Sequence, residues 1–183
     1  MKTTNQLSRD HQEILRALEI LTSAAATWRI DPLRTDKDCR ALLDFLKTFA
    51  DRCHHGKEEK VLFPKLMQAG IPMNGGPLGV MLYEHEQGRL LIRNMDQALE
   101  GKHPADFAFY ANRYARLLED HIAKEDNILF PKAEDVLTGE DDEALFRRFD
   151  EIENELSEDT HERFHHMLDT LASRYLSKPA KAS

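Results

Sequence analysis

The stretch HHGKEEKVLFPK at residues 54–65 recurs as HIAKEDNILFPK at residues 121–132. Both copies follow the pattern H-x-x-K-E-[ED]-x-[VI]-L-F-P-K. A match of this length is not chance, and a repeat so far along the chain indicates a duplicated pair of helices. The closing L-F-P-K, taken alone, is also compatible with a packing and stop signal at the end of a helix. The duplication is the observation from which the fold and the site are predicted.

A shorter echo precedes each copy of the repeat. The residues DHQE at 10–13 resemble EHEQ at 84–87. Each half of the chain therefore carries an acid-His pair on one helix and His-x-x-x-Glu on the next. Side chains four residues apart lie on one face of a helix, so His54 and Glu58 project together. The same spacing joins His121 to Glu125.

Helical periodicity extends over most of the chain, and no convincing strand is found. The connections between segments are short, which favours antiparallel neighbours. We therefore predict an all-α fold, an up-down-up-down four-helix bundle over residues 4–136 with an additional C-terminal helix over residues 141–176. The whole chain, 1–183, is expected to form a single domain. The expected helical segments are Thr4–Trp28, Asp36–Met67, Leu78–Leu99, Pro104–Val136 and Asp141–Leu176.

Composition excludes several classes of protein. The 183 residues include 25 Lys and Arg against 33 Asp and Glu, a net charge of -8, which argues against nucleic acid as a main partner. No apolar run approaches the roughly 18 residues that span a membrane, and no signal peptide is recognisable. Cys39 and Cys53 would lie about 21 Å apart in one helix, too far for a disulfide. A cytoplasmic location is expected.

The histidines and glutamates of the repeat indicate a metal site. Assembly of the bundle aims four imidazoles and two carboxylates at one interior point. Two buried carboxylates without compensation would be very costly, and a cation is the obvious compensation. Two carboxylates suit bridging between two cations, and a mixture of imidazole and carboxylate favours iron, with manganese or zinc possible. The alternative is ordinary hydrogen-bonded core histidines. The predicted ligands are His11, His54, Glu58, His85, His121 and Glu125.

At these residues, over about Leu7 to Pro131, the chain resembles the hemerythrin-like HHE cation-binding family. The resemblance implies a four-helix bundle with a non-haem di-iron centre, two Fe ions joined by an oxo or hydroxo bridge. The four histidines match the terminal ligands of the family. Glu58 and Glu125 match the two bridging carboxylates.

The chain departs from the oxygen-carrying hemerythrins at two places. Those proteins carry His-x-x-x-His on the third helix, where His85 is followed here by Arg89, and they end with His-x-x-x-x-Asp rather than His121-x-x-x-Glu125. The closer match is the bacterial subset and the hemerythrin-like domain of a eukaryotic iron-sensing ubiquitin-ligase subunit. In that domain the residue after the second-helix His is a ligand, so His55 is expected to replace the absent His. The alternative is a solvent-facing neighbour, since i+1 lies 100° around an α-helix.

Three further residues are candidates for a supporting role behind the ligands. Asp51 could accept from a ligating imidazole, although a surface acid needs no role. Tyr114 could donate to a bound ligand, or could be an ordinary core tyrosine. His161 could cap the site or relay protons, or be an ordinary histidine on a helix face.

Together these residues predict a non-haem di-iron protein that binds O2, NO or a related small ligand, in oxygen, iron or redox sensing or in storage. The alternative is a redox enzyme acting on peroxide or NO at the same centre. A third possibility is a bundle in which metal only stabilises the fold. The expected partner is a small diatomic ligand or peroxide. The sequence does not fix the oligomeric state.

Overall fold

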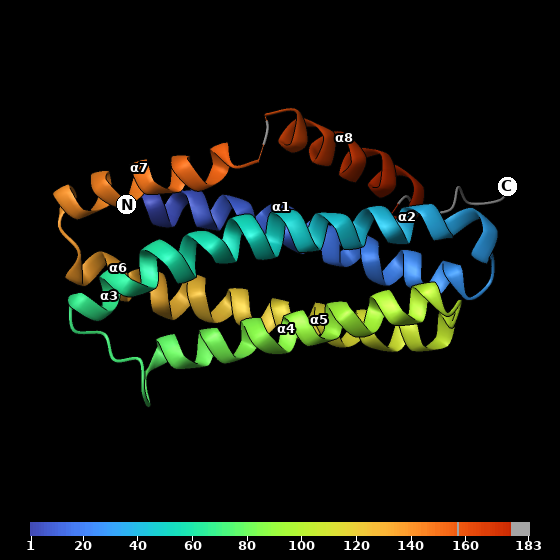
Figure 1. Ribbon diagram of the computed structural model, residues 1–183, viewed down its shortest axis with the longest axis horizontal. Coiled ribbons are helices and arrows are strands. Elements are labelled where there is room, and N and C mark those ends of the chain that lie inside the picture. Colours follow the sequence, from blue (N-terminus) through green and yellow to red (C-terminus); the bar gives the residue numbers. More distant parts are fainter. Residues whose placement is uncertain (157, 177–183) are drawn as a thin grey trace, which may run out of the picture.

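The computed structural model describes residues 1–156 and 158–176, and within them the chain forms helices and connecting loops without a strand (Figure 1). The predicted all-α fold is confirmed. Four rods run antiparallel, with α4 packed along α5, and α1 packed along both α5 and α2. The first and third rods are single helices, α1 (Lys2–Trp28) and α4 (Pro77–Glu100).

The second and fourth rods change their winding along their length. The second comprises α2 (Pro32–Phe45), the π-helical segments η1 (Leu46–His55) and η2 (Glu58–Leu62), and α3 (Phe63–Gln68). The fourth comprises α5 (Pro104–Lys124), the π-helical η3 (Glu125–Leu129) and α6 (Phe130–Val136). The L-F-P-K motif is therefore not a stop signal, because α3 and α6 continue beyond the Leu of each copy.

The second rod begins four residues earlier than the sequence predicts. Asp31-Pro32 resembles a helix breaker, but Asp31 caps the helix by accepting from the Arg34 N–H at 3.3 Å. Proline at the first helical position loses no hydrogen bond, since that N–H has no partner in a helix anyway. The dipeptide therefore starts α2 at Pro32 instead of delaying it to Asp36.

The predicted single helix over 141–176 is wrong, because the chain forms two helices there. A capping box between Thr138 and Asp141 starts α7 (Gly139–Asn154), and α8 (Glu158–Tyr175) follows. Phe149 on α7 and Phe164 on α8 pack into different hydrophobic clusters. The two helices have different axes because each packs on a different cluster. Hydrophobic periodicity does not reveal a change in helix axis, so the sequence does not predict the break.

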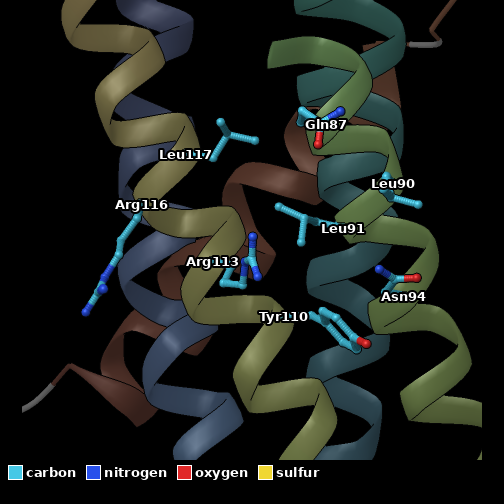
Figure 2. A pocket seen from close by; sticks show the side chains of 8 residues that line it. All are labelled: Gln87, Leu90, Leu91, Asn94, Tyr110, Arg113, Arg116 and Leu117. Carbon is cyan, nitrogen blue, oxygen red and sulfur yellow. The ribbon is translucent and has the colours of Figure 1, made fainter. Parts of the chain in front are cut away.

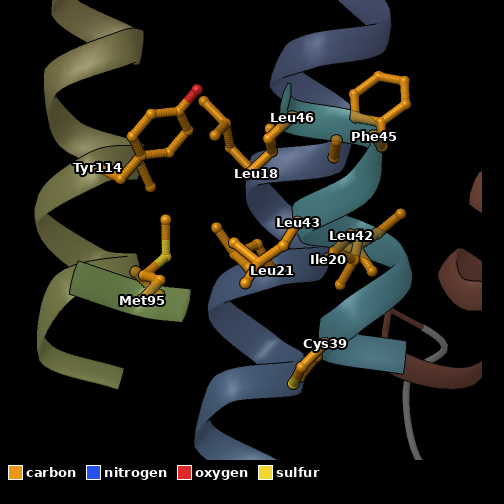
Figure 3. Packing of buried hydrophobic residues seen from close by; sticks show 14 of the residues in the cluster. Leu18, Ile20, Leu21, Cys39, Leu42, Leu43, Phe45, Leu46, Met95 and Tyr114 are labelled. Carbon is orange, nitrogen blue, oxygen red and sulfur yellow. The ribbon is translucent and has the colours of Figure 1, made fainter. Parts of the chain in front are cut away.

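Two hydrophobic clusters fill the bundle, one toward each end. The larger cluster includes Leu21, Leu46 and Tyr114 (Figure 3), and the smaller one includes Leu7 and Phe149. Along each of the four rods, the predicted ligand histidines fall where one cluster gives way to the other. The bundle therefore holds a buried polar layer between two apolar layers.

Cys39 and Cys53 are both buried and have free thiols, as their spacing predicts. In the described part of the chain, no helix is both long enough and apolar enough to cross a membrane.

Candidate metal centre

The repeated motif gives both of its copies the same unusual winding. The Phe63 N–H donates to the Glu58 carbonyl, and the Phe130 N–H donates to the Glu125 carbonyl, each five residues back. The next residue in both copies is proline, which has no N–H and whose ring would clash with the carbonyl four residues back. The helix widens into a π turn just before each proline. Such turns are frequent at functional sites, and here each begins at a predicted bridging glutamate.

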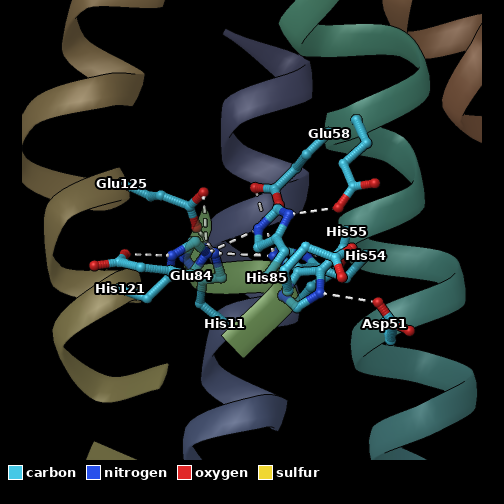
Figure 4. A network of polar contacts seen from close by, with 12 residues as sticks. His11, Asp51, His54, His55, Glu58, Glu84, His85, His121 and Glu125 are labelled. Atoms are coloured by element: carbon cyan, nitrogen blue, oxygen red, sulfur yellow. Dashed lines mark hydrogen bonds and ion pairs between the residues drawn. The ribbon is translucent and has the colours of Figure 1, made fainter. Parts of the chain in front are cut away.

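The structure brings all seven predicted ligands into one buried cluster (Figure 4). None of their side chains is more than 3% exposed. Two imidazole pairs meet through their Nε2 atoms, His11 with His54 and His85 with His121, each at 3.1 Å. The first pair connects α1 to η1 of the second rod, and the second pair connects α4 to α5 of the fourth rod.

The two carboxylates lie across these pairs. Glu58 places Oε1 at 3.6 Å from His54 Nε2 and Oε2 at 3.4 Å from His85 Nε2. Glu125 places Oε2 at 3.2 Å from His11 Nε2 and Oε1 at 3.3 Å from His121 Nε2. Each carboxylate therefore spans from one imidazole pair to the other, one oxygen to each.

His55 also belongs to the cluster. Its ring stacks on His85 with 3.8 Å between centroids, and its Nδ1 lies 3.4 Å from Asp51 Oδ1. The solvent-facing alternative is wrong. The segment Leu46–His55 is π-helical, with more residues per turn than an α-helix, so His54 and His55 lie closer together around the axis and both face inward.

The cluster has the donor atoms that a pair of cations requires. Within residues 1–156 and 158–176, none of the four carboxylate oxygens of Glu58 and Glu125 has a hydrogen-bond donor, and His55 Nε2 has no hydrogen-bond partner, although all five atoms are buried. Burying such atoms unpaired is costly, and metal coordination is one way to compensate them. Two overlapping groups could each hold a metal ion: His11, His54, Glu58 and Glu125 in one, His55, Glu58, His85 and His121 in the other.

A carboxylate stands behind every imidazole of the cluster. Such a partner fixes the tautomer, so that Nε2 faces inward. Asp51 fills this place for His55, as the sequence suggests. The sequence reasoning missed the other four, although the repeat contained the signal in the acid before His and the second acid of K-E-[ED]. The pairs are Asp10 with His54 at 3.3 Å, Asp126 with His11 at 2.9 Å, Glu59 with His85 at 2.6 Å, and Glu84 with His121 at 3.0 Å.

The lysine of each repeat forms an ion pair with the acid that precedes His11 or His85. Lys57 is 0% exposed and donates to Asp10 at 2.9 Å and to Glu153 on α7 at 2.5 Å. Burial lowers the pKa of Lys57, but Asp10 and Glu153 outweigh burial and raise it above its usual value. Lys124 forms the corresponding ion pair with Glu84.

Arg89 lies four residues after His85, at the position where the oxygen-carrying hemerythrins have another histidine on the third helix. Its guanidinium donates to Asp51 at 2.8 Å and to Glu59 at 2.7 Å. Those two acids are the partners of His55 and His85. The arginine therefore fixes the support of both histidines instead of replacing a ligand.

Without a cation, the nearest compensation for the two glutamates comes from ion-pair contacts with His11 at 3.2 Å and His85 at 3.4 Å, which lack hydrogen-bond geometry. Burial lowers the pKa of His11, but Asp126 and Glu125 raise it to about 10. Burial likewise lowers the pKa of His85, but Glu58 and Glu59 raise it to about 9. For His55, burial and the neighbouring His85 push the pKa well below its usual value. His55 is therefore neutral at pH 7, with a free ligand lone pair.

Two predicted supporting residues lie outside the contacts of the cluster. Tyr114 is buried beside Gly88, and its hydroxyl has no hydrogen-bond partner in the described residues. Burial, with a smaller effect of Asp51, raises its pKa. His161 on α8 packs its ring against Phe49 at 5.8 Å instead of reaching the cluster.

A separate pocket of about 530 Å³ lies between α4 and α5 (Figure 2). Tyr110, Leu117 and the partly exposed Leu90 contribute to its lining. None of its lining residues belongs to the cluster or to the acids behind it.

Comparison with known proteins places the chain in a family. The model of the hemerythrin HHE cation-binding domain matches residues 2–133. Uncharacterized proteins of Mycobacterium tuberculosis and Mycobacterium bovis are 25% identical over 81% of this chain, which spans 60% of their length.

The iron-sulfur cluster repair protein YtfE of Escherichia coli is 33% identical over 44% of this chain and 40% of its own. No solved structure matches the chain significantly. The family match covers well over half of the chain and includes all seven clustered residues, so the protein belongs to the hemerythrin HHE cation-binding domain family.

Proposed function

We propose that this protein is a non-haem di-iron protein that binds O2, NO or a related small ligand. One observation carries the proposal: four buried carboxylate oxygens, for which the described part of the chain offers no hydrogen-bond donor, face the Nε2 atoms of two imidazole pairs. Carboxylates that span between two groups of nitrogen ligands suit two cations better than one.

The seven residues divide into two metal positions. The first metal position comprises His11 and His54, and the second comprises His55, His85 and His121. Glu58 and Glu125 would each offer one oxygen to either position, because each carboxylate reaches an imidazole of both groups. The first position thus has fewer protein ligands and leaves more room for a small molecule.

Two arguments favour iron over manganese or zinc. Five imidazoles with two carboxylates form a mixed set that suits iron. The Escherichia coli relative is named for iron-sulfur cluster repair, which links the family to iron.

Burial supports small-ligand binding. An iron pair held by these residues would supply a site for diatomic ligands and for electron transfer to them. The chain supplies an enclosure in which no ligand residue is more than 3% exposed, which excludes bulky substrates. We therefore propose a role in oxygen, iron or redox sensing, or in storage.

The second candidate is a redox enzyme that acts on peroxide or NO at the same centre. The observation in its favour is the buried hydroxyl of Tyr114, which has no hydrogen-bond partner among the residues that the structure describes. A turnover reaction would gain from a hydrogen-bond donor sheltered from bulk water, and burial raises the pKa of Tyr114, which keeps its phenol protonated for that role. Consumption of peroxide or NO that falls in Tyr114→Phe would favour this candidate, whereas a stable ligand adduct unaffected by that change would favour binding.

The test is metal analysis of protein produced with iron, together with its absorption spectrum in air. We expect two iron ions per chain and the charge-transfer absorption of a bridged iron pair. Glu58→Gln should lose metal from both positions. The matched control Glu151→Gln, an exposed change on α7, should keep both. A protein that takes up no metal, or a single zinc ion, would refute the proposal.

A further inference from the structure

Helix α7 lies beyond the residues that match the family, yet it reaches the metal centre. Glu153 near its end accepts from Lys57 Nζ at 2.5 Å. Lys57 also donates to Asp10 Oδ2 at 2.9 Å, and the same Oδ2 lies 3.3 Å from His54 Nδ1. A continuous chain of polar contacts therefore leads from α7 to a predicted ligand of the first metal position.

Several contacts fix α7 in this place. Phe149 and Ile152 are buried in the smaller hydrophobic cluster. Asp142 accepts from the Lys2 and Thr3 backbone N–H groups at the start of α1, at 2.9 and 3.1 Å. Gln6 Nε2 donates to Glu153 Oε1 at 2.7 Å. The carboxylate of Glu153 is thus held against Lys57 by the packing of α7 before it and by the hydrogen bond from Gln6.

One oxygen of Asp10 serves two donors, and this makes the charge of Glu153 important. Lys57 and His54 both approach Oδ2, so a stronger hold by the ammonium leaves less electron density for the imidazole. Because Glu153 shares the ammonium, it weakens that hold. A buried lysine needs a compensating charge, and without Glu153 Asp10 would have to provide all of it.

The other half of the centre lacks this arrangement. Lys124 approaches Glu84 Oε1, whereas His121 approaches Oε2, so the two donors do not compete for one oxygen. Lys124 is also 34% exposed, and water can solvate its charge. Among the described residues, no second acid forms an ion pair with it.

We propose that Glu153 is a positioning residue for His54, through which α7 tunes the first metal position and leaves the second unaffected. The inference rests on the proposed function, since it assigns a role toward the metal that the centre binds. A carboxylate behind a ligating imidazole raises the basicity of the ligand. Glu153 keeps Asp10 free to act in that way, so the two metal positions differ in metal affinity.

The decisive variant is Glu153→Gln, which removes the charge but keeps an oxygen that can accept from Lys57 and Gln6. Its matched control is Glu151→Gln on the same helix, at a residue that is 68% exposed and pairs with Arg148. The imidazole Nδ1–H signals of His54 and His121 are followed by NMR in the metal-free and the zinc-loaded protein. We expect an upfield shift at His54, because its hydrogen bond weakens, and no shift at His121.

Competition with a chelator gives a second measurement. Loss of a direct carboxylate partner costs about 10- to 100-fold in metal affinity, so Asp10→Asn should reach that range. Glu153→Gln acts one residue further away and should cost less, at one of the two metals only. The shorter Glu153→Asp, which keeps the charge, should recover part of the affinity.

Equal shifts at His54 and His121, or no shift at either, would overturn the inference. So would a loss of affinity at both metals that follows a lower unfolding temperature, since α7 would then act through stability alone. A protein that takes up no metal contradicts the proposed function, whereas intact metal binding with an unresponsive His54 contradicts only the role of Glu153.

Discussion

Replacement of His55 by leucine should strengthen the metal-free protein and weaken the metal-loaded one. In the metal-free protein His55 is neutral and buried, and its Nε2 has no hydrogen-bond partner in the described part of the chain. Such an unsatisfied atom costs about 1–3 kcal/mol. Leucine is of similar size and removes the polar atom. Asp51 keeps its contact with Arg89 at 2.8 Å, so it is not left unpaired.

The magnitude in the metal-free state follows from these contacts. The change removes the penalty on Nε2 but also loses the long 3.4 Å contact with Asp51 and the stacking on His85. We expect a net gain of about 1 kcal/mol. For a chain of this length, that gain corresponds to about 2–4 °C in the unfolding temperature.

The metal-loaded state should respond in the opposite direction. The second metal position would lose one of its three imidazoles. Every tenfold loss of affinity removes about 1.4 kcal/mol of metal-derived stability when metal is in excess. A tenfold loss therefore already cancels the gain, and a hundredfold loss reverses it by more than 1 kcal/mol.

The assay is thermal unfolding of the same preparation with and without iron(II), under anaerobic conditions, with the metal content measured beside it. His103→Leu is the control, because His103 is an exposed histidine. Unchanged metal content and an unchanged loaded unfolding temperature would remove His55 from the ligands. A metal-free variant several degrees less stable than the parent would refute the argument about its Nε2.

Three further predictions follow from the structure. The pKa values of His11 and His85 are raised to about 10 and about 9, so protonation of these histidines stabilises the metal-free fold fully below pH 6.5. This stabilisation is lost as the pH rises to 9 and then 10, so the urea midpoint of unfolding should fall over that range. A urea midpoint that does not change with pH would contradict the prediction. Pro64→Ala and Pro131→Ala each supply a backbone N–H, which allows the π turn before it to rewind as α-helix. Rewinding would rotate Glu58 or Glu125 away from the cluster, so metal content should fall while the helical circular dichroism stays constant. Phe149→Ala should lower the free energy of unfolding by about 3–5 kcal/mol in urea titrations, because the ring is fully buried; a change under 1 kcal/mol would show that α7 is loosely held.

Much of the fold could be predicted because it rests on periodicity and duplication. The paired motifs at residues 54–65 and 121–132 identify two equivalent helix pairs, and the apolar spacing places them in a bundle. The start of the second rod at Pro32 was missed, because Asp-Pro reads equally as a break or as a cap followed by a first helical residue. The turn between α7 and α8 depends on which clusters the two helices meet, and no local pattern reports that.

The cluster follows the same division. The repeat places the four histidines and two glutamates on inward faces, and the structure brings them together, while their metal ligation stays a prediction. His55 could not be placed from α-helical geometry, because its segment is wound as a π-helix. The acid partners lie in the repeat, as Glu59 and Asp126 show, but their pairing across helices is a tertiary fact. Glu153 carries no signal in the sequence.

The crossed pattern of acids has a consequence for the origin of such a site. His85 depends on Glu58 and Glu59 from the first helix pair, and His11 depends on Glu125 and Asp126 from the second. A single helix hairpin therefore lacks some of the acid partners of its own histidine, whereas two copies in an isologous homodimer could supply these partners to each other. Fusion of the two copies into one chain would free each half to diverge. The halves now differ where the first repeat has His55 and the second has Ile122, and α7 packs against α1 and η2 of the first half.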